Sequence, residues 1–164
     1  MVILGIDPGL ATLGYGVIRS EGDRCQLIQF GVLTTAAGQP LPSRLRSVFL
    51  GINQLMDIYK PDEVAFEELF FSKNVTTGMA VSAARGAALA AAATRTEKLF
   101  EYTPMQVKQA VTGHGKADKL QVQTMVKILL NMQEIARPDD AADALAVALT
   151  HAQSARMSSL FRIQ

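Results

Sequence analysis

The stretch that decides the fold is Val2-Ile3-Leu4-Gly5-Ile6-Asp7-Pro8-Gly9, an apolar run that ends on a carboxylate. Its β-branched residues and the Pro-Gly pair that bounds it predict a strand buried on both faces. An acid at the mouth of such a strand is costly unless it is hydrogen-bonded or faces a bound charge. Asp before Pro-Gly is also ordinary turn chemistry, so Asp7 alone fits a turn as well as a functional site.

The rest of the chain alternates strands and helices. Hydrophobic periodicity predicts strands at 13–18, 25–35, 63–69 and 99–102, and helices at about 40–59, 75–97, 104–112, 117–132 and 137–151. The first three strands form an antiparallel meander. The helix at 40–59 is a crossover, and strands joined by a crossover in one sheet run parallel. The acids that end the strands at 2–7 and 63–69 therefore lie at the same edge.

Small residues select one acid at each strand end. Gly5-x-Asp7 and Ala65-x-Glu67 each place a small residue on the face of the acid, because alternate strand residues share a face. Glu68 falls on the opposite face, so we prefer Glu67 as the site residue. The small residues also predict that another element packs closely on this face.

The last helix is the element that fits this face. Asp140 and Asp143 are three residues apart, so they project from one face of its first turn, about 4.5 Å apart along the axis. The alanines around them allow a close approach to the sheet, whereas Asp139 is better explained by the helix dipole. We therefore expect one cluster of four carboxylates: Asp7, Glu67, Asp140 and Asp143.

Four like charges in a small volume raise one another's pKa and need cations. Oxygen ligands without paired histidines or cysteines favour Mg²⁺ or Mn²⁺. Two such ions, about 3.5–4 Å apart, support in-line phosphoryl displacement. Residues 71–130 hold eight Lys or Arg against three Asp or Glu, which fits a nucleic-acid partner, although a solvated helix face also collects lysines.

Length and composition bound the class of protein. The 164 residues, 49% of them hydrophobic, predict one domain at 1–153 and a flexible C-terminal tail at 154–164. Cys25 is the only cysteine, which excludes an internal disulfide. No signal peptide and no apolar run of bilayer length are evident, so we expect a cytoplasmic protein.

The order of the predicted elements is similar to that of the ribonuclease H-like nucleases. Their fold is α/β, with a mixed five-stranded sheet, an antiparallel meander plus parallel strands, flanked by helices. Up to about His151, five strings also closely resemble the RuvC family of crossover junction endodeoxyribonucleases: Gly5–Gly9, Gly14–Gly16, Leu41–Leu45, Gln106–Gln109 and Asp140–Ala146.

The resemblance implies a homodimer that binds a Holliday junction and nicks two strands of like polarity symmetrically. It implies a role in homologous recombination and DNA repair beside the RuvA–RuvB branch-migration complex. It also implies two Mg²⁺ ions per site, with Mn²⁺ as a substitute, held by the same four acids.

DNA contacts are implied at further positions. Lys108 and Lys119 fall where the family has lysines important for DNA handling and catalysis. Phe70 falls where the family stacks an aromatic at the junction centre, and its alternative is a core position. Lys73 and Lys116 are further candidates for DNA binding.

Three other functions compete with this one. The sugar kinase, actin and Hsp70 group shares a Gly-x-Asp hairpin but needs a second, similar domain. A junction-binding protein without catalysis has no use for four carboxylates near phosphates, which they repel. A YqgF-type RNA nuclease is the nearest competitor in chemistry.

Overall fold

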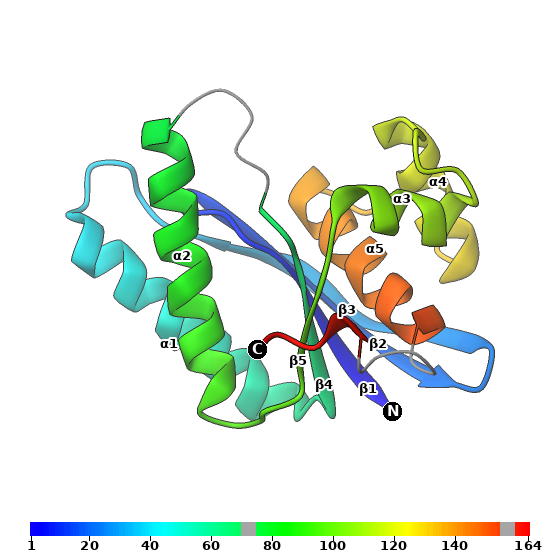
Figure 1. Cartoon of the computed structure of the whole chain (residues 1–164), viewed down its shortest axis with the longest axis horizontal. Helices are drawn as coiled ribbons and strands as arrows, with labels where there is room; N and C mark the ends of the chain where they lie inside the picture. The colour runs from blue at the N-terminus through cyan, green and yellow to red at the C-terminus, as the bar shows by residue number, and fades with distance from the viewer. Residues whose placement is uncertain (70–74, 155–159) are drawn as a thin grey trace.

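The computed structural model describes residues 1–69, 75–154 and 160–164, and Figure 1 shows one sheet with helices on both of its faces. The strand order is β3-β2-β1-β4-β5. The strands are β1 (Val2–Asp7), β2 (Thr12–Glu21), β3 (Arg24–Thr34), β4 (Glu63–Glu67) and β5 (Leu99–Tyr102). β1, β2 and β3 are antiparallel neighbours, whereas β4 runs parallel to both β1 and β5. The predicted mixed five-stranded sheet is confirmed.

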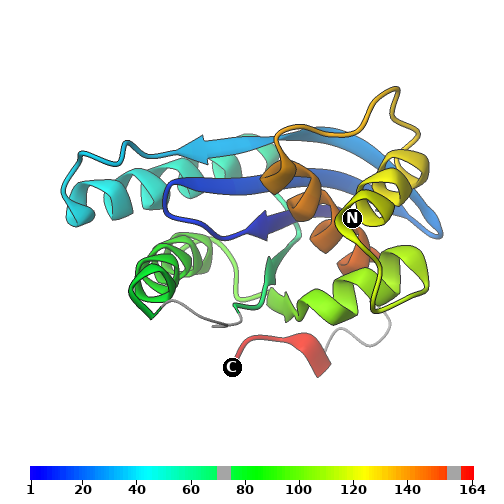
Figure 2. The same ribbon diagram turned by 90° about the horizontal axis from the view of Figure 1, so that it is seen from above.

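Two groups of helices cover the sheet. They are α1 (Leu41–Tyr59), α2 (Val75–Ala93), α3 (Pro104–Thr112), α4 (Lys119–Leu129) and α5 (Asp139–Ser154). α1 and α2 pack together on one face, and α5 packs on β1 and β2 from the other. α3 and α4 lie outside α5, on the side of the molecule away from α1 and α2 (Figure 2).

Two predicted helices are shorter in the structure. The helix predicted at 75–97 ends at Ala93, where the hydroxyl of Thr94 donates to the carbonyl of Ala91 at 2.7 Å. The helix predicted from residue 117 begins at Lys119, because Asp118 caps it. Its carboxylate accepts from the amide of Gln121, and the Gln121 side chain accepts from the amide of Asp118.

Backbone contact between α5 and the sheet defines the core on that side. A Cβ built on Gly5 would lie 2.2 Å from the carbonyl oxygen of Ala144, and one on Gly14 would lie 1.9 Å from that of Asp140. Only glycine permits this spacing. The close packing predicted from Gly5 and Ala65 is therefore present, and α5 is the element that supplies it.

The last described residues lie against β5. Arg162 forms an antiparallel bridge with Phe100, and the amide of Ile163 donates to the carbonyl of Leu99 at 2.9 Å. Residues 155–159 lie outside the described part of the chain, so the domain boundary at residue 153 and the flexible tail stay predictions. Among the described helices, none has the length and apolar character to cross a membrane.

Replacing Gly5 should be costly. In Gly5→Ala the new methyl group meets backbone atoms, which cannot rotate away, so we expect a loss of about 1–3 kcal/mol in the free energy of unfolding. Urea denaturation measures it. Gly38→Ala is the matched control, because a Cβ there meets nothing within 4 Å. Equal midpoints for the two variants would contradict the packing described above.

Candidate active site

The four predicted acids gather where β1, β4 and α5 meet. Asp7 ends β1 and Glu67 ends the parallel neighbour β4, and the two side chains share a hydrogen bond. Asp7 is the register partner of Gly14 on the neighbouring strand β2, and Gly14 lies against the backbone of Asp140. The first turn of α5 is thereby held beside Asp7, and Asp143 is close enough to act electrostatically on both strand acids.

Like charges and burial disturb the titration of this cluster. Burial, with neighbouring Glu67, Asp143 and Asp140, raises the pKa of Asp7 to about 8 from an ordinary value of 3.8. Burial and the charge of Asp143 also raise the pKa of Glu67. Asp7 therefore keeps its proton to a higher pH than an ordinary aspartate does.

Two lysines supply positive charge beside the acids. Lys119 Nζ lies 3.0 Å from Asp143 Oδ2, and Lys108 and Lys119 both favour the charged form of Glu67. A pocket of about 220 Å³ is lined by these two lysines together with Glu67 and Asp143. The cap at Asp118 makes Lys119 the first residue of α4, which is how its amine comes to face α5.

The neighbouring acids behave differently. Asp139 accepts a hydrogen bond from Gln123 Nε2 at 3.0 Å and pairs with Arg137 and Lys119. The Gln123 bond, with the charge of Lys119, lowers the pKa of Asp139. Glu68 follows the end of β4, and its amide donates to the carbonyl of Tyr102. Asp139 is thus turned toward α4.

The chemistry of the donor atoms fits Mg²⁺ or Mn²⁺. Four carboxylates converge here without a histidine or cysteine, and burial together with neighbouring carboxylates raises the pKa of Asp7, Glu67 and Asp143. Among the described side chains, however, no three acids form a ready-made metal site. Asp7 and Glu67 are bonded to each other and Asp143 to Lys119, so an ion has to replace a proton and an ammonium group.

Other predicted residues lie elsewhere. Phe70 and Lys73 fall outside the described residues. Lys116 is exposed in the loop between α3 and α4, as is His114. His151 is fully buried, with its ring nitrogens 2.7 Å from Tyr102 Oη and from Glu63 Oε2, which gives it a structural role. The DNA-binding roles of Phe70 and of the four lysines, Lys73, Lys108, Lys116 and Lys119, stay proposals.

One residue beside the acids was not selected from the sequence. Arg44 of α1 lines a groove that also contains Asp140. In the sequence, Arg44 stands out only as part of the string Leu41–Leu45. The spacing of residues along the chain does not show that α1 begins beside the β1–β2 turn.

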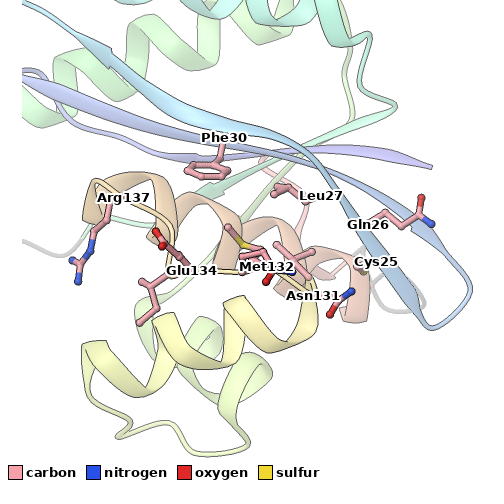
Figure 3. Close-up of a pocket in the computed structure, with 11 residues that line it drawn as sticks. Cys25, Gln26, Leu27, Phe30, Asn131, Met132, Glu134 and Arg137 are labelled. Carbon is pink, nitrogen blue, oxygen red and sulfur yellow. The ribbon is translucent and has the colours of Figure 1, made fainter.

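A larger hollow of about 730 Å³ lies between β3 and the segment before α5. Figure 3 shows Leu27 and Phe30 reaching from β3 toward the segment that carries Met132 and Glu134. Glu134 is the one carboxylate among its described lining residues. The hollow therefore lacks the clustered acids that divalent-ion chemistry requires.

A sheet of this order with acids at the ends of β1 and β4 and on the covering helix defines the ribonuclease H-like nucleases. Comparison with known proteins narrows the class: residues 3–151 match the family described as crossover junction endodeoxyribonuclease RuvC. The chain belongs to the RuvC family. This membership removes the support for the sugar kinase group and for a YqgF-type RNA nuclease.

Individual relatives agree with the family match. The crossover junction endodeoxyribonuclease RuvC of Alkaliphilus metalliredigens is 52% identical over 164 residues and covers the full length of both chains. The Thermus thermophilus RuvC structure is 41% identical, with a TM-score of 0.89 over 96% of each chain. T. thermophilus RuvC in complex with Holliday junction substrate is 38% identical, with a TM-score of 0.88 over 97% of this chain and 98% of that one.

In the presence of EDTA, the pH dependence of the free energy of unfolding should depend on Asp7. Because the pKa of Asp7 is higher in the folded than in the unfolded state, its contribution to stability is fully present below about pH 4 and is lost as pH rises through about 8. In EDTA at pH 8.5, Asp7→Asn should raise the free energy of unfolding by on the order of 1–3 kcal/mol. At pH 4 the gain should largely disappear.

Asp139→Asn is the control for this measurement. The pKa of Asp139 is lowered in the folded state, so its charged form contributes stability above the unfolded pKa, and its replacement should destabilise the protein at pH 8.5. Urea denaturation at both pH values separates the two signs. A loss of stability in Asp7→Asn at pH 8.5 would contradict the electrostatic account of the cluster.

Proposed function

We propose that this chain resolves four-way DNA junctions by hydrolysing one phosphodiester bond in each of two strands of like polarity. The observation that carries the proposal is the cluster of Asp7, Glu67, Asp140 and Asp143 in a chain of the RuvC family. Water attacks phosphorus in line and the 3′ oxygen leaves, so the products are 5′-phosphate and 3′-hydroxyl ends.

The four carboxylates are the proposed ligands of two Mg²⁺ ions, for which Mn²⁺ would substitute. When bound, the ions supply an activated water and stabilise charge on the phosphate and the leaving oxygen. Asp7 and Glu67 would give up their shared proton to bind them. The Lys119 amine, released from Asp143, would then be free to contact the negative phosphate together with Lys108.

The partners are proposed from the same family membership. Symmetric paired nicks require two active sites related by a two-fold axis, which a homodimer supplies. The substrate of the T. thermophilus relative in its complex is a Holliday junction, and we propose the same substrate here. RuvA–RuvB as partner and a cytoplasmic location are proposed on the same basis, with roles in DNA recombination and repair.

Replacing Glu67 or Glu68 by glutamine should show which of these two neighbouring acids is needed for cleavage. Glu67→Gln keeps the shape but removes a ligand charge, so cleavage of a synthetic four-way junction with Mg²⁺ should fall at least about 100-fold, or about 2.7 kcal/mol of transition-state stabilisation. Glu68→Gln is the matched control and should retain most activity. Gel-resolved nicking of labelled strands, beside a linear duplex and an RNA–DNA hybrid, measures both.

Two results would overturn the proposal. Full activity in Glu67→Gln with loss in Glu68→Gln would show that the wrong acid has been assigned. Tight junction binding by the wild type without nicks, in either metal, would indicate a junction-binding protein without catalysis.

Phe70→Ala tests the proposed stacking residue. Loss of a stacked aromatic should impair cleavage of intact junctions by about 10-fold or more without changing thermal stability.

A further inference from the structure

The acids of the cluster line two separate hollows. Asp143 and Glu67 line the pocket that contains Lys108 and Lys119, whereas Asp140 lines a second groove. This groove, of about 570 Å³, runs between the β1–β2 turn at residues 9–12 and the beginning of α2. A strand laid across the acids would therefore reach from one hollow to the other.

Arg44 is the cation of the second groove. Its Nε donates to Thr35 Oγ1 at 2.8 Å, and that hydroxyl donates to the carbonyl of Leu10 at 2.5 Å. The side chain is half-buried and joins α1 to the loop that follows Asp7. One neutral partner, Thr35, which is itself anchored to Leu10, thus holds the guanidinium in the wall of the groove.

Within the described part of the chain, no carboxylate neutralises the charge of Arg44. Arg85 and Arg95 form ion pairs with Glu101 and Asp57, whereas none of the described acids pairs with Arg44. The bond to Thr35 uses only Nε, and no other described residue bonds to the terminal nitrogens, so these can bind a ligand. A planar guanidinium with its position fixed matches the two oxygens of a phosphate.

The remaining walls suit a nucleic-acid backbone. Gly9 and Ala11 on one side and Ala80 on the other leave little bulk along the groove, and Thr76 supplies a hydroxyl at the first turn of α2. Asp140 is the one acid in this lining, at the end that joins the cluster. The groove therefore combines one fixed cation with one acid of the cluster.

We propose that Arg44 binds a backbone phosphate of the cleaved strand, on the side of the scissile phosphate opposite to Lys108 and Lys119. The inference rests on the proposed nuclease function and adds the residue that fixes the register of the strand across the acids. Thr35 acts through Arg44 as a positioning residue.

Substitution of Arg44 tests the contact. Arg44→Gln should lower kcat/KM for junction cleavage about 10- to 100-fold, as expected for loss of a hydrogen-bonded charge. The slope of log Kd against log salt should fall by about 0.7–0.9, the value for one phosphate contact. Thr35→Val, which keeps the charge but frees the guanidinium, should lose less activity and leave the salt slope unchanged.

Arg46→Gln is the matched control, since Arg46 is exposed on the same helix two residues on and lines neither hollow. It should behave as wild type. Thermal unfolding of all variants shows whether any loss of activity reflects folding.

Neutral phosphates locate the contact. Single methylphosphonates placed on either side of the cleaved bond remove one charge at a time. In wild type, one position flanking the scissile phosphate should slow cleavage, and in Arg44→Gln the same position should have little further effect. If Arg44→Gln only destabilised the fold, the methylphosphonate would slow cleavage by the same factor in the variant and in wild type.

The outcomes distinguish this inference from the proposed function. If wild type nicks junctions and Arg44→Gln matches Arg46→Gln, or remains as sensitive to the methylphosphonate as wild type, Arg44 does not bind the strand and the inference is wrong. If wild type does not nick junctions at all, the proposed function fails first. A methylphosphonate effect suppressed only by Arg44→Gln would establish the contact.

Discussion

The contact between the backbone of α5 and the glycines of β1 and β2 is the constraint on which the site depends. Gly5 and Gly14 leave no side chain between sheet and helix, so carbonyl oxygens of Ala144 and Asp140 rest directly on the strands. A backbone contact has no rotamers with which to adjust. The position of the acids on α5 relative to Asp7 is therefore set by the sheet itself.

This packing holds together groups that repel one another. Buried alanine, leucine and valine side chains fix α5 between the sheet and α3 and α4, and the apolar burial offsets the crowding of carboxylates at its first turn. The repulsion is relieved locally, by the hydrogen bond between Asp7 and Glu67 and by the ion pair of Lys119 with Asp143. The proposed cations would have to displace both.

Much of the site could be predicted from the sequence because its determinants are local. A small residue two positions before an acid shows which face the acid shares, and a three-residue spacing shows that Asp140 and Asp143 project together. Side-chain contacts between residues far apart in the chain could not be predicted from such local patterns. Arg44 meets Thr35 across a loop, and the bond between Lys119 and Asp143 depends on where the Asp118 cap starts α4.

The most direct test of the central claim is the position of Mn²⁺ in crystals of the wild-type protein, located by anomalous diffraction. We expect manganese bound by Asp7, Glu67, Asp140 and Asp143, with the hydrogen bond between Asp7 and Glu67 broken and Lys119 moved away from Asp143. Manganese bound elsewhere, with Asp7 still bonded to Glu67 and Lys119 still paired with Asp143, would contradict the assignment of these acids as metal ligands.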